Sequence, residues 1–358
     1  MKNEGRGQKR TRYALIGLLI LGLAAFPQFV TSPYLLSIFI FVGIYAIVAM
    51  GLCMLMGYAG QISIGQAAFY AVGAYTSGVL TATYKWDPWI AMVAAILLTG
   101  LVAVTTGTAL LRFQGHVLAV ATLALTSIVY VILVQMDKVT GGLSPGLPNV
   151  PPLSIAGFKL TTDTHYFYLT WAAVLVLILL ASNIVNSRVG RALRSFHHFY
   201  GGSEEAAQSA GVNPARYKIQ VFALSAMYAS VAGSFYAHYV SFLNPTPFNI
   251  FMSLQFLVMV ILGGLRSLWG AILGAVTVVA LGEVLRAVVP MFMPGAYGEY
   301  QIVAYGMVMI LILLVLPEGL VQAPRAIASG FGRLTSRRND SVEPSVRGQV
   351  APRPEEGG

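Results

Sequence analysis

The sequence predicts an all-α fold: a polytopic integral membrane protein of about ten transmembrane helices, with broken or re-entrant segments and both termini in the cytoplasm. Three observations lead to this prediction. The chain is 57% hydrophobic and 10% charged, whereas soluble domains carry about 25% charged residues. Residues 13–84 contain no Asp, Glu, Lys or Arg, which leaves room for three helices of about 20 residues. The basic residues are distributed unevenly between alternate connections.

Ten apolar runs are interpreted as spans. The first follows Lys9, Arg10 and Arg12 and has features of a secretory signal. The predicted topology works best if this run is retained as a transmembrane helix. The eighth run is short, and glycines interrupt the third. The predicted spans are residues 13–30, 34–56, 62–84, 89–111, 116–135, 166–185, 219–240, 253–265, 268–289 and 300–317.

The basic residues test this count independently, because hydropathy makes no use of their positions. With a cytoplasmic N-terminus, all but four of the 22 Lys and Arg residues fall on the cytoplasmic side; the exceptions are Lys85, Lys138, Lys159 and Arg286. Cytoplasmic loops of membrane proteins carry such an excess. The net charge of +9 is then explained by topology and by contact with anionic lipid headgroups, without a nucleic acid partner.

The chain is organised around one transmembrane domain, residues 13–317. Residues 1–12 form a basic cytoplasmic tail, and residues 318–358 a cytoplasmic, partly disordered tail rich in Pro, Arg and Ser. Two connections are long. Residues 136–165 face outward and contain four prolines, so we expect an irregular or partly extended loop. Residues 190–218 face the cytoplasm.

Several kinds of chemistry are missing from the sequence. No lysine follows the GxxxxGK[ST] pattern that cradles nucleotide phosphates, so any ATP must be hydrolysed by another protein. There is no HExxH motif, and the histidines lack carboxylates or cysteines at ligand spacing, so we predict no metal site, no cofactor and no catalytic residue. The one cysteine, Cys53, excludes an intramolecular disulfide. The five histidines are His116, His165, His197, His198 and His238.

Glu283 is the one candidate carboxylate for an ion pathway. Arg286 follows three residues later on the same helix face. Both lie near the outer end of the ninth predicted span, where we favour an interfacial ion pair over an ion-coupling site.

The cytoplasmic loop contains a short predicted helix. Residues 204–210 favour helix, and Gly211 is suited to the C′ position that ends it. Asn213 and Pro214 form a good N-cap and first-turn pair for the next span. Small side chains allow close approach, so this helix is suited to a groove in a partner protein; the alternative is a solvated loop.

Six stretches carry a resemblance to a known family. EEAAQSAG, residues 204–211, resembles the EAA signature of ABC importer permeases, whose coupling helix docks on an ATP-hydrolysing subunit. Over residues 40–317 the chain resembles the permease subunit of branched-chain amino acid importers. The stretches are GYAGQISIGQAAFYAVGAYTSG (57–78), TGGLSPGL (140–147), GRALR (190–194), EEAAQSAGV (204–212), YAHYV (236–240) and GGLRSLWGAILGA (263–275).

The resemblance implies a non-enzymatic transport permease, multi-pass in the bacterial inner (plasma) membrane. It implies four kinds of partner: a second permease subunit, two ATPase subunits that bind the ATP, an extracytoplasmic substrate-binding protein and membrane lipids. The residues that it assigns to ATPase coupling are Arg191, Arg194, Glu204, Glu205, Ala206, Ala207 and Gly211.

The chain departs from the family pattern in three places. HFYG, residues 198–201, looks inserted between GRALR and the EAA helix, although four residues are close to one helical turn. Arg266 stands where the family has glycine, and LPEGL, residues 316–320, replaces a basic version. No arginine-specific role is therefore carried over to these positions.

The glycine-rich stretch at residues 57–78 is the predicted substrate region. Glycines in a membrane permit close helix approach or a broken helix, and the N-terminus of a broken helix can receive a carboxylate with its N–H groups. The alternative is tight packing, with Gln61 and Gln66 hydrogen-bonded to a neighbouring helix. The predicted pathway residues are Gln61, Ser63, Gln66, Thr122 and Thr126.

Three other functions stay open at this stage. The same machinery imports urea, short amides or aromatic acids in related systems. An ion-coupled secondary transporter would depend on Glu283. A membrane-embedded enzyme would need a convergent set of polar groups, which the sequence does not offer.

Overall fold

The computed structural model describes residues 26–28, 32–110, 112–113, 115–155, 158–196, 202–292, 299–315 and 320. These residues are mostly helical, and a small antiparallel hairpin joins β1 (Ser154–Ile155) to β2 (Phe158–Lys159). The helices are α2 (Pro33–Cys53), the π-helix η1 (Met54–Tyr58), α3 (Gln66–Ala82), α4 (Pro88–Leu110), α5 (His116–Gln135), α6 (Asp137–Thr140), α7 (Asp163–Asn186), α8 (Arg188–Phe196), α9 (Glu204–Ser209), α10 (Pro214–Val240), the 3₁₀ turn η3 (Thr246–Phe248), α11 (Ile250–Gly263), α12 (Leu268–Phe292) and α13 (Glu299–Val315).

The predicted spans from 34–56 onward each coincide with a helix. The first, 13–30, lies outside the described residues except for 26–28, as do the tail 1–12 and, apart from residue 320, the tail 318–358. The third prediction was wrong at its start, because α3 begins at Gln66 and not at residue 62. In the part of the chain that the structure describes, six helices are long and apolar enough to cross a membrane: α2 with η1, α4, α5, α7, α10 and α12.

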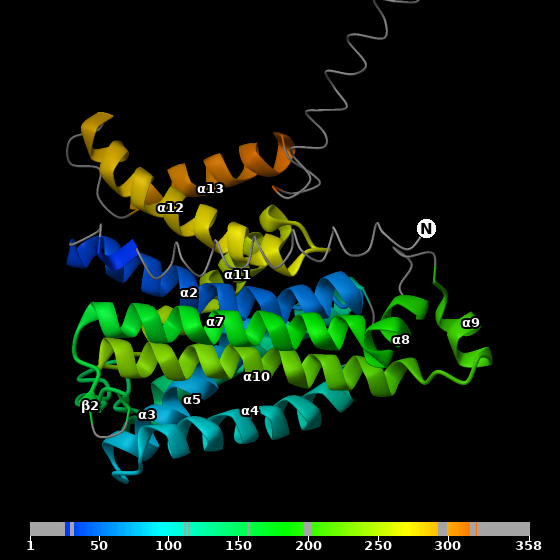
Figure 1. Cartoon of the computed structure of the whole chain (residues 1–358), viewed down its shortest axis with the longest axis horizontal. Helices are drawn as coiled ribbons and strands as arrows, with labels where there is room; N and C mark the ends of the chain where they lie inside the picture. Colours follow the sequence, from blue (N-terminus) through cyan, green and yellow to red (C-terminus); the bar gives the residue numbers. More distant parts are fainter. Residues whose placement is uncertain are drawn as a thin grey trace, which may run out of the picture. The chain divides into compact units, whose positions relative to one another are not determined.

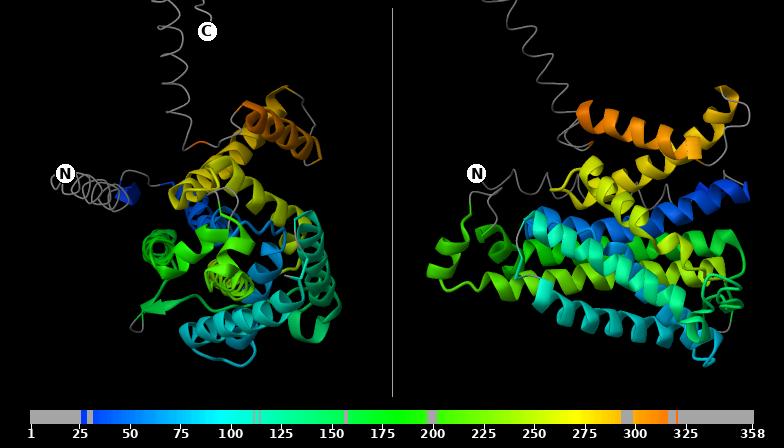
Figure 2. Two further views of the ribbon diagram at one scale, coloured as in Figure 1. Left: turned by 90° about the vertical axis from the view of Figure 1, so that its right-hand side faces the viewer. Right: turned by 180° about the vertical axis from the view of Figure 1, so that it is seen from behind.

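Helix α2 is the centre of the described bundle. It packs against α7, α10, α11 and α12, while α4 lies on one side of the bundle and α12 and α13 on the other (Figures 1 and 2). Every residue from Ala46 to Leu55 is buried. A helix that is apolar all round is stable only when other helices cover it on every side, and this accounts for the uninterrupted hydrophobicity of the segment.

Helices α3 and α10 pack closely against each other. A Cβ atom added at Gly233 would lie 2.0 Å from the carbonyl oxygen of Tyr70, and one added at Gly73 would lie 2.4 Å from the Cα of Ser230. Thr99 of α4 donates a hydrogen bond to the Ser230 hydroxyl at 3.0 Å. Glycine and serine allow the backbones to approach this closely, and in a membrane such packing replaces the hydrophobic driving force.

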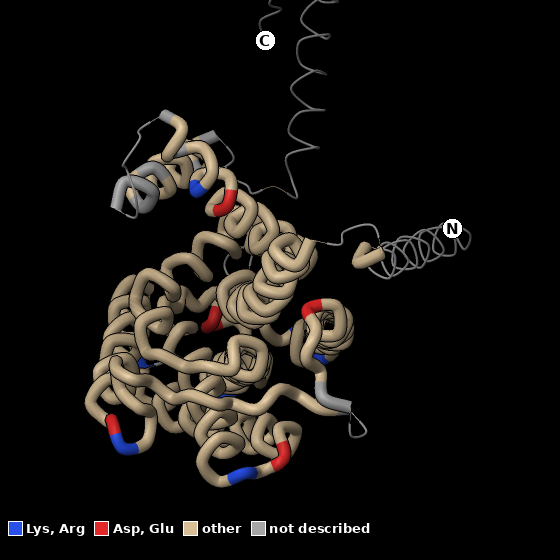
Figure 3. The backbone as a smooth tube through the Cα atoms, turned by 90° about the vertical axis from the view of Figure 1, so that its left-hand side faces the viewer, with Lys and Arg blue, Asp and Glu red and all other residues tan. Residues whose placement is uncertain are grey.

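The connections gather at two opposite ends of the bundle (Figure 1). Helices α8 and α9 lie at one end, with the connections from α4 to α5 and from α11 to α12. The β hairpin and the connections from α3 to α4 and from α10 to α11 lie at the other. Charged residues are sparse along the described backbone (Figure 3). The basic residues of the α8–α9 end are Arg112, Arg188, Arg191, Arg194, Arg216, Lys218 and Arg266.

The hairpin end is held together by a buried histidine. His238 is 0% exposed. Its Nδ1 lies 2.7 Å from the Pro151 carbonyl oxygen, which can only accept, so Nδ1 carries the proton and Nε2 accepts from the Ser77 hydroxyl at 2.8 Å. The Tyr166 hydroxyl donates to the His238 carbonyl oxygen at 2.8 Å. These bonds join α3, α7, α10 and the long connection between α5 and α7, which is partly extended as predicted.

The α3–α10 contact generates a testable prediction. Gly233→Ala places a methyl group against the Tyr70 carbonyl oxygen, so we expect the protein to lose about 1–3 kcal/mol of stability through overpacking. Thermal unfolding in detergent would measure this as a lower Tm. Gly306→Ala is the matched control, since a Cβ there meets nothing within 4 Å. An unchanged Tm for Gly233→Ala would contradict the described helix contact.

Candidate functional site

A break in the helical backbone lies between α2 and α3. Helix α2 continues into the π-helix η1, the Gln61 amide donates to the Leu55 carbonyl oxygen at 3.2 Å, and helical structure resumes only at Gln66. Isolated π-helical turns are frequent at functional sites. Non-helical backbone at membrane depth is tolerated only where it is buried in protein or lines a water-filled path.

The break lies well inside the bundle. The Gln66 amide nitrogen Nε2 donates to the Ser225 hydroxyl of α10 at 2.8 Å. At a rise of 1.5 Å per residue, Ser225 is about 16 Å from the start of α10, a helix about 40 Å long. Helix α3 therefore begins near the middle of a neighbouring span, as expected of a discontinuous membrane helix.

Hydroxyl groups from other helices satisfy the start of α3. The Ile64 amide donates to Thr122 Oγ1 of α5 at 2.9 Å, and the Ala67 amide donates to Ser253 Oγ of α11 at 3.0 Å. Thr126 Oγ1 donates to the Ile64 carbonyl oxygen at 3.2 Å. No side chain of α3 itself caps this terminus. In this conformation, hydroxyl oxygens already accept hydrogen bonds from two backbone N–H groups near the start of α3. Such N–H groups are the donors that the sequence analysis expected to bind a substrate carboxylate.

Two glutamine side chains have buried acceptors in this region. Gln61 Oε1 and Gln66 Oε1 are buried without a hydrogen-bond partner among the described residues. An unpaired buried acceptor costs about 1–3 kcal/mol. For Gln66, the bond from Nε2 to Ser225 matches the packing alternative, but the carbonyl oxygens of both side chains remain available to an incoming N–H donor.

The predicted pathway residues therefore come together. We call the set around the break the α3 start cluster. Gln61 is buried on the same segment and has no described side-chain bond. Sequence reasoning missed Ser225 and Ser253, although each is a small polar residue within a mostly apolar helix. The α3 start cluster consists of Gln61, Ser63, Gln66, Thr122, Thr126, Ser225 and Ser253, all of them buried.

The helix predicted in the cytoplasmic loop is present as α9, and its terminal residues act as predicted. Gly211 has φ +81°, in the left-handed region that favours glycine. Its amide donates to the Gln208 carbonyl oxygen at 2.9 Å, and the Val212 amide donates to that of Ala207 at 2.9 Å, which is a Schellman motif. Asn213 Oδ1 accepts from the Arg216 amide at 3.2 Å and caps α10.

The predicted coupling residues divide into two groups. Glu204 pairs with Lys218 of α10, and Ala207 is buried. Arg194 donates to the Val185 carbonyl oxygen of α7 at 2.7 Å. These three residues hold α8 and α9 to the bundle. The residues exposed to solvent or a partner are Arg191, Glu205, Ala206 and Gly211. The apparent insertion, residues 198–201, lies outside the described residues.

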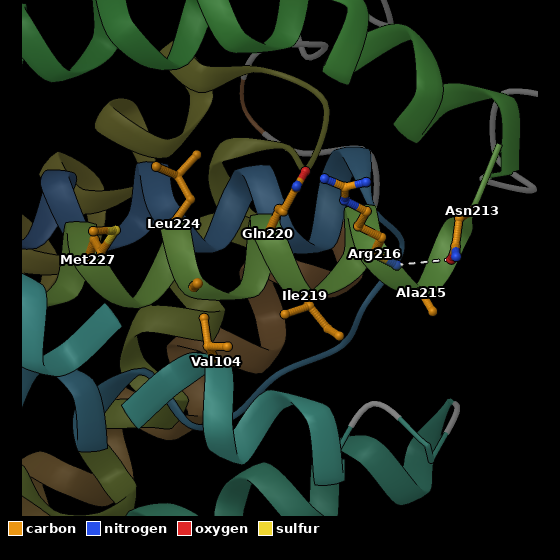
Figure 4. Close-up of a pocket in the computed structure, with 9 residues that line it drawn as sticks. Val104, Asn213, Ala215, Arg216, Ile219, Gln220, Leu224 and Met227 are labelled. Atoms are coloured by element: carbon orange, nitrogen blue, oxygen red, sulfur yellow. Dashed lines mark hydrogen bonds between the residues drawn. The ribbon is translucent and has the colours of Figure 1, made fainter. Parts of the chain in front are cut away.

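A groove of about 650 Å³ runs beside this surface. It follows the first turns of α10 and is bounded by Val104 of α4 (Figure 4). Its wall includes Ile219 and Met227, with Arg216 and Gln220 as polar members. A partner that docks on α9 would therefore also meet an apolar groove next to it.

Glu283 and Arg286 form the predicted pair at the opposite end. Arg286 Nη1 donates to Glu283 Oε1 at 3.2 Å. Among the described residues, no group of three or more His, Cys, Asp or Glu side chains is arranged to hold a metal ion.

Comparisons with known proteins give one family. Residues 34–316 match the family described as branched-chain amino acid transport system / permease component. The chain is 28% identical over 330 residues to the high-affinity branched-chain amino acid transport system permease protein LivM of Escherichia coli (strain K12). The alignment covers 87% of this chain and 75% of LivM. The chain is 24% identical over 298 residues to the corresponding permease protein LivH of the same organism, covering 78% of this chain and 92% of LivH. No solved structure gives a significant match.

The hydroxyl caps of α3 generate a testable prediction. Thr122→Val keeps the shape of the side chain but leaves the partly buried Ile64 amide unpaired, so we expect a loss of about 1–3 kcal/mol of stability. Thermal unfolding in detergent would measure it. Thr108→Val is the control, because that hydroxyl is exposed and bonds only to its own helix. Equal effects of both substitutions would contradict the capping role.

Proposed function

The chain belongs to the branched-chain amino acid transport permease family, since the match covers residues 34–316, and we propose that it is a membrane subunit of an ABC importer for branched-chain or other hydrophobic amino acids. The observation that carries this proposal is α9. This helix bears the EEAAQSAG sequence, lies at one end of the bundle and presents Glu205 and Ala206 on its exposed side. An exposed helix with a small-residue face is suited to docking on a partner.

The importer would take its energy from separate ATPase subunits. The relatives LivM and LivH are both named permease proteins of one type of transport system, which supports a second permease chain as partner. By the positive-inside rule, the α8–α9 end with its seven basic residues would face the cytoplasm. The hairpin end would then receive the substrate-binding protein outside the inner membrane of a bacterial cell.

The described contacts support a path for motion from α9 to the spans. The capped turn at Gly211 and the Glu204–Lys218 pair join α9 to α10. Helix α10 in turn packs without a gap on α3, and its Ser225 binds Gln66 at the α3 start cluster. A displacement of α9 by the ATPases would therefore move the region where α3 begins. Alternating access requires such a connection between motor and pathway.

We place the substrate pathway at the α3 start cluster. Its members among the predicted residues are Gln61, Ser63, Gln66, Thr122 and Thr126. Gln66 bonds to Ser225 near the middle of α10, and transporters commonly bind substrate near the bilayer midplane. The unpaired Oε1 atoms of Gln61 and Gln66 suit the ammonium group of an amino acid. In an alternate conformation, the amides of Ile64 and Ala67 would exchange their hydroxyl partners for the substrate carboxylate.

A second candidate is the same machinery carrying urea or a short amide. It is favoured by the same two carbonyl oxygens, because they also accept from amide N–H groups. Ion coupling is not proposed, since Glu283, the one candidate carboxylate for it, lies at the hairpin end and apart from the α3 start cluster.

Assembly and coupling give one prediction. The tagged protein, solubilised in detergent, is expected to retain a second permease chain and two ATPase chains. Glu205→Lys reverses an exposed charge on α9. Gly211→Pro cannot adopt φ +81°, because the proline ring fixes φ near −65°. We expect both substitutions to abolish ATP-driven uptake and the retention of ATPases, with unchanged amounts of protein in the membrane.

Glu205→Gln is the matched control for that experiment, because it keeps the size of the side chain without reversing its charge. Normal uptake by Glu205→Lys and Gly211→Pro would remove the coupling role of α9. Purification of the parent protein without any ATPase chain would contradict the importer proposal itself.

The pathway residues give a separate prediction. For Gln61→Ala and Gln66→Ala we expect the efficiency of uptake, the maximal rate divided by KM, to fall about tenfold, which corresponds to one lost hydrogen bond of about 1.4 kcal/mol. Initial rates in proteoliposomes would measure it. Gln135→Ala, at the exposed end of α5, is expected to change nothing. Unchanged efficiency in both variants would leave the cluster with a packing role only.

A further inference from the structure

A large cavity lies apart from the α3 start cluster, in the half of the bundle that contains the hairpin end. It has a volume of about 860 Å³, is lined by residues of α2, α11, α12 and α13, and is open on one side. Its walls are mainly apolar or aromatic and include Phe41, Tyr45, Leu254 and Met309. We call it the outer cavity. Its volume lies in the usual range for small-molecule sites, which are concave and mostly apolar with a few convergent polar groups.

Two opposite charges lie side by side in the wall of the outer cavity. Glu283 and Arg286 both line it, with side chains that are 25% and 65% exposed. Tyr34 donates a hydrogen bond to Glu283 Oε2. Arg286 bonds to the carboxylate through Nη1 alone, so its guanidinium, which has five N–H donors, keeps donors for another anion.

The two opposite charges and the apolar walls together restrict which ligands can bind in the outer cavity. A free anion is repelled by Glu283 and a free cation by Arg286, whereas a zwitterion places each charge next to its opposite. The apolar walls then favour a hydrocarbon side chain on the same molecule, since burial of apolar surface is favourable. An α-amino acid with an aliphatic or aromatic side chain satisfies all three conditions.

Helix α11 separates the outer cavity from the α3 start cluster. Leu254 and Gln255 line the cavity, while the preceding residue, Ser253, binds Ala67 at the start of α3. Aromatic contacts continue in the same direction: the Tyr45 ring packs edge-on against Phe256 at 5.7 Å, and Phe256 packs against Tyr70 at 5.6 Å. The two polar regions are thus one helix apart.

We propose that the outer cavity is a binding site for a zwitterionic, hydrophobic α-amino acid before it reaches the α3 start cluster. Arg286 binds the carboxylate, Glu283 binds the ammonium group, and the side chain packs against Phe41 and Tyr45. This inference rests on the proposed importer function and assigns to it a second, outer site.

Cysteine protection in the assembled transporter tests the site directly. Gly282 lines the cavity next to Glu283, and a Cβ there meets nothing within 4 Å, so Gly282→Cys introduces a thiol without a collision. The native Cys53 is buried and stays in place. At leucine concentrations about three times its Kd, we expect alkylation by N-ethylmaleimide to slow about fourfold, because about a quarter of the sites are then free.

Matched variants make the result specific. Val284→Cys, on the same helix, 56% exposed and not part of the cavity wall, is expected to react at a rate that leucine does not change. Adding Glu283→Gln or Arg286→Gln to Gly282→Cys is expected to abolish protection. For the same reason, 4-methylpentanoate and 3-methylbutylamine, which each lack one charge of leucine, are expected to protect less.

Three outcomes would overturn the proposal: no protection by leucine, protection that survives both charge-neutralising substitutions, or protection that depends on phosphatidylethanolamine in the nanodisc and not on leucine. The last result would assign the cavity to a zwitterionic lipid headgroup. ATP-driven leucine uptake by the Gly282→Cys complex distinguishes a failure of the outer site from a failure of the importer proposal. Uptake without protection removes the outer site alone, whereas a parent complex that does not transport any amino acid removes the importer proposal.

Discussion

The structure depends on one constraint: a backbone amide inside a membrane must find a partner within the protein. The helix that begins at Pro33 stops at η1, and α3 starts again near the middle of its neighbours, so several amides lack intrahelical partners. Thr122 and Ser253 supply the missing acceptors from α5 and α11. Because these hydroxyls are placed by other helices, the position of the break depends on the packing of the whole bundle.

Tight packing links that break to the opposite surface of the protein. Gly73 and Gly233 let the backbones of α3 and α10 approach closely. Helix α10 also carries α9 at its cytoplasm-directed end in the proposed orientation, through a Schellman turn and the Glu204–Lys218 pair. If a separate motor drives the protein, as proposed, this connection would carry its motion to the polar residues near the centre of the bundle.

Charge is arranged in keeping with transport of a zwitterion. The α3 start cluster contains hydroxyls, amides and carbonyl groups but no ionised side chain, so it can hold a charged ligand only by dipoles that are aligned with the start of a helix. The outer cavity instead contains an ion pair, Glu283 with Arg286, close to the hairpin end. At the hairpin end, His238 of α10 bonds to Ser77 of α3 and to Pro151.

The sequence by itself determined the membrane class, the approximate positions of the described helices other than the start of α3, the caps at Gly211 and Asn213, and the pairing of Glu283 with Arg286. Each depends on hydropathy or on residues a few positions apart, so a linear pattern contains the necessary information. It also singled out Gln61, Ser63, Gln66, Thr122 and Thr126, but without showing what they contact. Only the tertiary structure decided that Ser225 and Ser253 join them, that hydroxyls satisfy the start of α3, and that residues of four helices line the outer cavity. Ala67 and Ser253 are 186 positions apart, and contacts at that separation depend on the way helices pack, which no local propensity specifies.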